Sequence, residues 1–492
     1  MALASITGTL NNRGLGLPRG TVRPIGVVGC SSSGTVDTPT MIYSRDQAIS
    51  TFGHGPLVEA LCFLIAYAGG PFVATRATTA TAGSAGSVTR AGTGSDSDAW
   101  AMTVSGTPRD AYSVKVKVTR YGATLEALTA AIRYSIDGGQ TYNAEQPVPS
   151  SGAVVLGDTG LTVTFADDSD ADEAFVGDVY SFTCTEPVWD TTGLGTALAA
   201  MKNVADPLWH DGVLVVGNVA ASSWTTVKAS HDALISAAKP RWFIVNARDQ
   251  DVAGAESDST YVASLLGGSP GFAGTSGDLI ARAFGFALTD SQGIGGIWRR
   301  PVSWHIAAAL AARPLHHHPG RVKSGVLPGI RENGLLHDIS STAFSSMDTG
   351  GFVGAQKLEG VAGYIATDRT AAAAGSDFAT AGVMRARVIG YATRVFMQRC
   401  VEEVNVEREV NDDGTLTAAE ADALDEALTS YMVGEVNNPR LNRKYCTDVG
   451  VTVSRTANVR DTGQIPTRLR VKPLAYSNFI TIEAAFAASV RS

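Results

Sequence analysis

Between residues 78 and 187 the sequence changes character, and this change divides the chain. Residues 78–96 are nearly all Thr, Ala, Gly and Ser, and short runs of alternating apolar and polar residues follow, separated by Asp-Gly-Gly and Gly-Asp turn signals. Such alternation buries one face of each strand. We therefore predict an inserted all-β domain at 78–187, with strands at Trp100–Val104, Tyr112–Val118, Ile132–Ser135, Leu161–Phe165 and Val179–Phe182.

On both sides of this insertion strands alternate with helices, which is typical of an α/β chain. Before it we expect a strand at Pro24–Gly29, a helix at Leu57–Tyr67 and a strand at Phe72–Ala77. After it we expect strands at Gly212–Val216, Trp242–Asn246 and Ile297–Val302, and helices at Ala221–Ala237, Asp278–Leu288, Ala379–Val406 and Ala418–Tyr431. The predicted fold class is α+β / α/β, a multi-domain chain whose mixed-sheet core has flanking helices and is built from N- and C-terminal parts.

The two ends of the chain differ from its middle. Residues 1–22 hold only a few spaced apolar residues, too few to pack alone, and are predicted to form an extended arm. The last 45 residues return to strands, at Val449–Arg455, Arg468–Lys472 and Phe479–Glu483, whose edges need partners. The expected divisions are the arm at 1–22, core at 23–77, the inserted β-rich outer domain at 78–187, core at 188–445, and strands with an arm at 446–492 that complete the core sheet and a neighbour's sheet.

Charge and composition exclude several classes of protein. The 492 residues include 39 basic and 47 acidic ones, so a net charge of −8 gives no general attraction to nucleic acid or to an anionic membrane. The longest apolar run, Ala60–Ala68, is too short to span a bilayer. The first twenty residues lack the basic start and apolar segment of a secretory signal, so we expect folding in a cytoplasm.

The five cysteines indicate neither a zinc site nor a disulfide scaffold, because no two have CxxC spacing. Cys446 stands beside Arg443 and Lys444 in a loop-like stretch, where nearby cations favour the thiolate. We predict that Cys446 is the exposed thiol and the candidate for a disulfide between chains.

Motifs for catalysis or metal binding are weak. Gly267–Gly271 satisfies G-x-S-x-G around Ser269, yet it follows a helical segment rather than a strand. The three histidines at 316–318 are consecutive and cannot share one metal ion as i, i+4 ligands do. Glu409, Asn411, Asp413, Gly414 and Glu420 nearly fit a calcium loop, but the first position is Glu, and Thr417 with Glu420 has capping-box spacing. We predict no catalytic residue, cofactor or metal, and a self-assembling building block rather than an enzyme.

The order of segments resembles the contractile tail sheath proteins of bacteriophages and related contractile injection machines. Four stretches carry the resemblance, and together they cover most of the chain outside 78–187, a region that this family uses for variable outward-facing insertions. The Ala- and His-rich segment at 305–320 departs from the family pattern. The stretches are Pro24–Gly29 with the following loop, helix and Phe72–Arg76; Ser303–Arg313; Asp368–Thr370 and Gly375–Phe378 with the long helix and Asp413–Ala421; and Val451–Val459 with Val471–Tyr476.

The resemblance implies a structural subunit that polymerises into stacked hexameric rings around an inner tail tube and drives that tube through the host envelope on contraction. The implied partners are further copies of the chain, the inner tail tube protein, and the baseplate and tail terminator proteins, with no nucleic acid bound directly and no membrane insertion. The implied location is the virion tail, assembled in the bacterial host cytoplasm.

Sheath subunits of this kind exchange terminal arms, and an arm that cannot bury itself can satisfy its main chain by adding a strand to a neighbour's sheet. We expect this at both ends of the chain. The candidate residues for strands between subunits are Ile6, Leu10, Leu469, Val471, Ile480 and Ile482.

Two alternative functions stay open. An α/β serine hydrolase would need Ser269 or another serine to react as a nucleophile. A secreted surface-layer or adhesin protein would need export, which the N-terminal sequence does not support.

Overall fold

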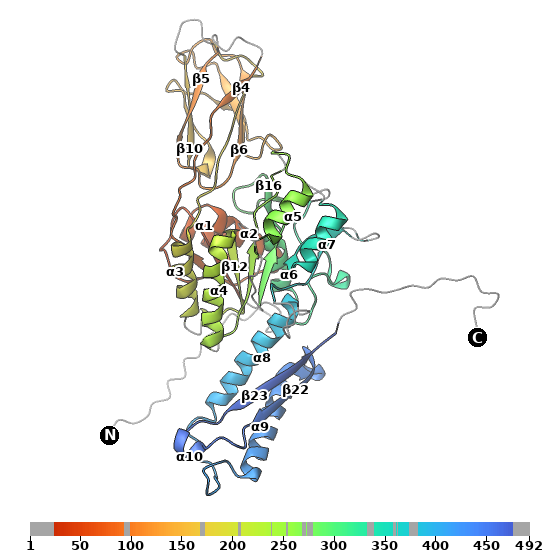
Figure 1. Ribbon diagram of the computed structural model, residues 1–492. Helices are drawn as coiled ribbons and strands as arrows, with labels where there is room; N and C mark the ends of the chain where they lie inside the picture. The colour runs from red at the N-terminus through yellow and green to blue at the C-terminus, as the bar shows by residue number, and fades with distance from the viewer. Residues whose placement is uncertain are drawn as a thin grey trace, which may run out of the picture.

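The computed structural model places three bodies one after another along the molecule, with the inserted domain at the top, the core in the middle and a C-terminal body below (Figure 1). The expected strand residues Ile6, Leu10, Ile480 and Ile482 lie outside the residues that the structure describes. Those described are 24–92, 99–167, 173–204, 208–237, 239–251, 254–267, 272, 279–331, 339–357, 361, 363–372 and 382–475.

The core is built on a seven-stranded sheet in the order β17-β14-β13-β12-β1-β3-β2. All neighbours run parallel except β2, which pairs antiparallel with β3. In the middle, Val27 lies opposite Ala74 on one side and Leu214 on the other, so the sheet joins segments from before and after the insertion. This confirms the mixed-sheet core. The strands are β1 (Ile25–Gly29), β2 (Thr40–Ile42), β3 (Phe72–Arg76), β12 (Gly212–Asn218), β13 (Trp242–Asn246), β14 (Ile280–Ala283) and β17 (Phe352–Val353).

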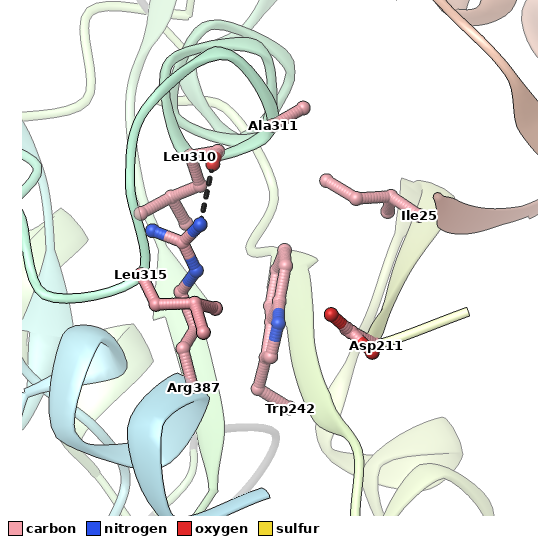
Figure 2. Close-up of a pocket in the computed structure, with 7 residues that line it drawn as sticks. All are labelled: Ile25, Asp211, Trp242, Leu310, Ala311, Leu315 and Arg387. Carbon is pink, nitrogen blue, oxygen red and sulfur yellow. Dashed lines mark hydrogen bonds between the residues drawn. The ribbon is translucent and has the colours of Figure 1, made fainter. Parts of the chain in front are cut away.

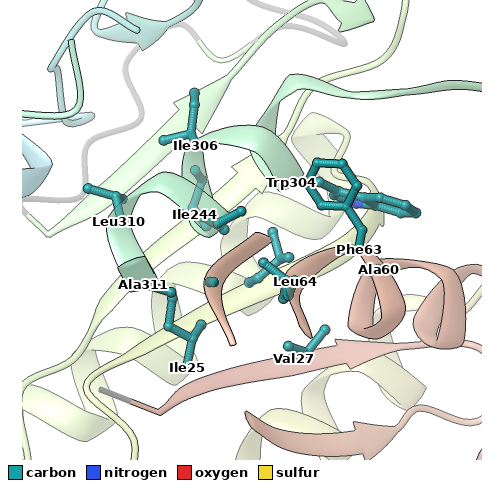
Figure 3. Packing of buried hydrophobic residues seen from close by; sticks show 14 of the residues in the cluster. Ile25, Val27, Ala60, Phe63, Leu64, Ile244, Trp304, Ile306, Leu310 and Ala311 are labelled. Atoms are coloured by element: carbon teal, nitrogen blue, oxygen red, sulfur yellow. The ribbon is translucent and has the colours of Figure 1, made fainter. Parts of the chain in front are cut away.

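Helices cover both faces of this sheet, as a parallel sheet requires. Alternate side chains separate the faces: Val27 packs with α2 (Pro56–Ala68) and α6 (Val302–Ala312), and Val28 with α3 (Thr191–Lys202) and α4 (Ala221–Ser236). Figure 3 shows the first of these layers, where Phe63 of α2 lies beside Trp304 of α6. The core also contains α1 (Arg45–Phe52), α5 (Asp258–Leu266), α7 (Ser341–Thr349), and the hairpin of β18 (Ala355–Lys357) and β19 (Tyr364–Ala366).

The helix predicted at Asp278–Leu288 is wrong, because the segment forms two strands. Core strand β14 ends at Ala283 and β15 (Phe286–Asp290) begins after Gly285, whose φ of +86° belongs to the left-handed region. A short continuous apolar run has the same appearance in a buried strand as in a buried helix, so periodicity could not separate the two. Strand β15 then pairs with β16 (Ile297–Pro301) as an antiparallel hairpin.

The inserted domain is all-β, with one sheet of three strands and one of five. Its core contains alternate residues of the predicted runs, such as Val114, Val116 and Val118. The strand orders are β5-β10-β9 and β4-β11-β6-β7-β8. The strands are β4 (Thr89–Ala91), β5 (Ala101–Gly106), β6 (Ser113–Arg120), β7 (Ala131–Ser135), β8 (Gln146–Pro147), β9 (Ala153–Val155), β10 (Leu161–Ala166) and β11 (Val179–Thr183).

The hairpin β15–β16 fastens the inserted domain to the core. Trp298 packs within the hydrophobic core of the inserted domain, with its ring centroid 5.3 Å from that of Tyr112. The buried Arg300 guanidinium donates two hydrogen bonds, of 3.1 and 2.7 Å, to the carboxylate of Asp110. One strand of the core hairpin therefore supplies both an apolar anchor and a buried ion pair to the other body.

The C-terminal body is a separate unit rather than a completion of the core sheet, which corrects the prediction for 446–492. Strands β22 (Cys446–Val453) and β23 (Thr467–Pro473) form their own two-stranded sheet, packed with α8 (Val383–Val401) and α9 (Ala418–Val436). The predicted boundary at 445 is also wrong, because this body already begins within α8. Smaller elements are β20 (Asn437–Asn438), β21 (Arg443–Lys444) and α10 (Val459–Thr462).

One continuous helix, α8, joins this body to the core. Val383 and Ala386 belong to the core cluster, whereas Val395 and Phe396 belong to the cluster of the C-terminal body. At the junction Arg387 donates hydrogen bonds to the carbonyl oxygens of Leu310 (2.6 Å) and Arg313 (3.1 Å) at the end of α6.

The junction is closely packed. A cavity beside Arg387, lined also by Ile25, Asp211, Trp242 and Leu315, has room for about one water molecule (Figure 2).

In the part of the chain described here, no helix is both long enough and apolar enough to cross a membrane.

Candidate assembly site on the C-terminal body

Strands β22 and β23 form an antiparallel ribbon that lies on the two helices of the C-terminal body. Val449 is opposite Val471, and Val451 is opposite Leu469. An isolated two-stranded ribbon is marginal in water, so this one depends on the apolar stripe of α9 beneath it. That stripe consists of Leu424, Leu428, Met432 and Val436, all buried. Alternation along β23 leaves Arg468, Arg470 and Lys472 exposed on the other face.

The outer edge of β22 is closed by side chains from α9 and β20. The main-chain N–H of Val451 donates to Oγ1 of Thr429 (3.0 Å), and that of Val453 donates to Oδ1 of Asp425 (2.6 Å). At the other end of the strand, the side-chain amide of Asn437 donates to the carbonyl oxygen of Thr447 (3.2 Å). Since these main-chain groups already have partners, another strand cannot add to β22 without displacing them.

The outer edge of β23 has no partner strand in the described part of the chain. In an antiparallel pair, successive residues point their main-chain groups alternately toward and away from the partner strand. The main-chain N–H groups of Val451 and Val453 point away from β23, so the main-chain groups of Gly450 and Thr452 point toward it. The hydrogen bond from the N–H of Ser454 to the carbonyl oxygen of Pro466 (2.8 Å) follows the same alternation.

It follows that the main-chain N–H and C=O groups of Leu469 and Val471, opposite Val451 and Val449, point outward. No hydrogen-bond partner for these groups occurs among residues 24–475 as far as the structure describes them. Their side chains pack against the cluster of the C-terminal body and are half-buried. The structure therefore places these two candidates on a strand edge that faces solvent.

Cys446 is not the exposed thiol that the sequence predicted. Its side chain is fully buried, and its thiol donates to the carbonyl oxygen of Val436 (3.6 Å). Burial raises the pKa of the Cys446 thiol to about 11. The register of β22 shifts between Cys446 and Asp448, which turns the cysteine inward although alternation with Asp448 would place both outside. A disulfide to another chain would require this end of the ribbon to open.

The calcium-like loop is a structural turn between two helices. Asp413 accepts hydrogen bonds from the main chain and hydroxyl of Thr415, and Glu420 pairs with Arg408 at 2.7 Å. Thr417 caps α9, its hydroxyl accepting from the N–H of Glu420 at 3.3 Å. Among the residues covered by the structure, no three His, Cys, Asp or Glu side chains are grouped to hold a metal ion. Ser269 lies outside them, and Gly267 before it follows helix α5.

A comparison with models of protein families shows which family the chain belongs to. The model described as DUF2586, N-terminal domain, matches residues 3–370. The chain belongs to this family. No curated protein matches the sequence.

Solved structures similar to this DUF2586 chain are sheath proteins. The sheath complex of PVC, an extracellular contractile injection system, in its contracted state has a TM-score of 0.52 at 11% identity, with 100% of this chain and 99% of that chain covered. The sheath tail protein of Listeria innocua has a TM-score of 0.50 at 10% identity, with 94% of each chain covered. The contracted helical sheath of the anti-feeding prophage has a TM-score of 0.50 at 11% identity, covering 98% and 99%. The chain therefore has the sheath-protein fold over its whole length, as the sequence resemblance implied.

Sequence reasoning missed Asp425 and Thr429, which close the β22 edge. They stand four residues apart on α9, each directly after a leucine of the buried stripe, so they flank the ribbon on one side of the helix. Short polar residues at that spacing beside an apolar stripe are the available signal. It does not reveal which strand edge they meet.

Proposed function

We propose that this chain is the structural subunit of a contractile tail sheath, polymerising into a helical tube around an inner tail tube. The observation that supports the proposal most directly is the open edge of β23 on a full-length sheath fold. A strand edge with unpaired main-chain groups is a template for another chain, and natural proteins cover such edges unless they use them.

Neighbouring subunits complete this edge by strand addition. A donated arm pairs with Leu469 and Val471, and its main-chain hydrogen bonds each contribute about 1 kcal/mol net. The donors are the terminal segments that carry Ile6 and Leu10 at one end and Ile480 and Ile482 at the other. Because the β22 edge is closed, strands add on one side only, and a contact between two different surfaces that does not close on itself generates a helical array.

The junctions between the three bodies of the subunit are suited to movement of the subunit as one rigid body. Hairpin β15–β16 fastens the inserted domain to the core, and α8 runs unbroken into the C-terminal body, so contraction rotates subunits while the arms keep them connected. If contraction buried roughly 200 Å² more apolar surface per subunit, it would release about 5 kcal/mol for each, multiplied over the whole tube.

Further partners follow from the same proposal. They are the inner tail tube protein along the lumen, and baseplate and terminator proteins at the two ends of the tube. We propose that the tube is assembled in a bacterial host cytoplasm as part of a phage or phage-like tail. The role needs no catalysis, and we propose none.

Negative-stain electron microscopy of the purified full-length chain tests the proposal. Long striated cylinders are expected from it, whereas variants lacking residues 1–20 or 478–492 are expected to stay folded and soluble without forming cylinders. Matched circular dichroism spectra and thermal unfolding curves establish that the truncated variants fold. Cylinders formed equally well by both truncated variants would contradict strand exchange as the means of assembly.

A further inference from the structure

The C-terminal body carries opposite charges at the two ends of α9. The segment from Glu402 to Glu426, which leads into this helix, contains ten acidic residues and one basic residue. The segment after it, 437–447, contains three basic residues and no acidic one. Since α9 has 19 residues, its ends lie about 28 Å apart. In Figure 1 the helix begins at the end of this body that lies far from the core.

Part of the charge at each end has no ion-pair partner among the residues that the structure describes. Near the start of α9, Glu402 and Glu403 pair with Arg399, and Glu420 pairs with Arg408. Glu407 and Glu409 are exposed and form no ion pair with any residue that the structure describes.

At the other end Arg443 pairs with Glu435. Arg440 and Lys444 are exposed and likewise have no ion pair within the described ranges. Lys472 of β23, which lies opposite the exposed Asp448 in the register, has none there either. We name the surface of Val401–Asp413 the acidic tip, and that of Arg440–Lys444 with Lys472 the basic end.

Exposed apolar side chains accompany both surfaces. Val401, Val404 and Val406 on the acidic tip are 70%, 62% and 44% exposed, and Leu441 at the basic end is 58% exposed. Large aliphatic side chains with charged residues around them are the composition of a protein interface, in which an apolar centre is surrounded by a polar rim.

We propose that the acidic tip of one copy docks on the basic end of a second copy, forming an end-to-end contact between C-terminal bodies. The contact rests on the proposed self-assembly and adds to strand exchange, because it uses side chains at the ends of α9 rather than the β23 edge. Two complementary surfaces on one chain identify the occupant as another copy. The whole chain has a net charge of −8, so the basic end is a local excess of the opposite sign.

Such a contact depends on salt. Exposed charges attract each other over about 10 Å at 0.1 M ionic strength and over about 3 Å at 1 M. Charge steering also speeds encounter between copies, and it sets their orientation by disfavouring tip-to-tip and basic-to-basic approaches.

Charge reversal in the full-length chain tests this contact by sedimentation velocity at 0.05 and 0.5 M NaCl. The tip variant is E407K with E409K, and the basic-end variant is R440E with K444E. The control is K117E with R133E, two exposed cations that face each other across β6 and β7 of the inserted domain. Thermal unfolding of each variant, matched to the wild type, shows that folding is intact.

At low salt each reversal variant is expected to associate roughly tenfold more weakly than the wild type, and the control to match the wild type. An equimolar mixture of the two reversal variants should recover the association, because each reversed tip then meets a reversed basic end. The proposal is overturned if either variant associates like the wild type, if the mixture gains nothing over its components, or if the wild type shows no salt-dependent association.

Microscopy of the same samples separates this contact from the proposed function. Wild-type cylinders together with unaffected reversal variants would reject the contact and leave the sheath role standing. Charge-dependent association without cylinders under any condition would reject the sheath role and retain the contact.

Discussion

The two bodies attached to the core are joined to it in different ways. The inserted domain receives a hairpin from the core, with Trp298 inside its hydrophobic cluster and the Arg300–Asp110 pair buried at the junction. The C-terminal body continues from a single helix and leaves the main-chain groups of Leu469 and Val471 facing solvent. The first body is completed by its own chain, whereas the second has an edge that a neighbour can complete.

The largest effect is expected from breaking the junction of the inserted domain. R300M leaves the Asp110 carboxylate buried without its cation, and removing one partner of a buried ion pair costs about 3–5 kcal/mol. The free energy of unfolding, measured by denaturant titration, should fall by that amount. R299M, on the same strand, removes a partly exposed pair with Asp249 and should cost about 1 kcal/mol at most. Equal losses in the two variants would contradict a fastening role for Arg300.

A pH titration is expected to destabilise the core through a buried histidine. His305 of α6 is fully buried, and desolvation lowers its pKa to about 4 from an ordinary value near 6.5. Since the folded state holds the neutral ring, the unfolded state binds more protons below pH 6.5, and stability falls as the pH drops toward 4. For this group the limiting loss is about 3 kcal/mol. In unfolding titrations between pH 6.5 and 4, H305Q should reduce the loss of unfolding free energy as the pH falls. An unchanged pH dependence would assign this loss to other groups.

A smaller loss is expected where the C-terminal body meets the core. Arg387 donates to the two carbonyl oxygens that end α6, and hydrogen bonds from a charged group contribute about 1.5–3 kcal/mol. R387M should lower the free energy of unfolding by that amount, less than R300M does. The reverse order would mean that the C-terminal body is the more firmly fastened of the two.

Much of the fold, but not all of it, could be predicted from the sequence alone. Period-two alternation was sufficient for the inserted strands, such as β6, in which Val114, Val116 and Val118 are the buried residues. It failed at 278–288, where β14 is buried on both faces and so lacks the period that distinguishes a strand from a helix. The sequence pattern also gave the wrong exposure for Cys446, because the register shift in β22 cannot be recognised from the order of apolar and polar residues.

The candidate site was half predictable. Leu469 and Val471 alternate with charged residues, so their strand could be recognised, and strand edges are expected to need partners. Which edge is open depends on Asp425 and Thr429, and on the packing of α9 against β22 rather than β23. Such tertiary placement cannot be read from local spacing.

The smallest effect on stability is expected from opening the closed edge of the ribbon. D425A removes the acceptor for the Val453 N–H and should lower the free energy of unfolding by about 1–2 kcal/mol. In assembly assays this variant should give irregular or branched aggregates, because β22 then also offers an unpaired group. D422A, one turn earlier on α9 and paired only with the exposed Arg455, is the matched control and should assemble normally. Cylinders of normal width from D425A would show that closing the β22 edge has no part in directing assembly.

The most direct measurement of the central claim is the assembly of V471P beside V471A, followed by light scattering and negative-stain microscopy. Both substitutions remove the branched valine side chain, but only proline removes the outward main-chain N–H, and it leaves the hydrogen bonds between β23 and β22 intact. The account predicts folded protein from both variants, cylinders from V471A, and none from V471P. Cylinders from V471P as abundant as those from V471A would contradict strand addition at the β23 edge.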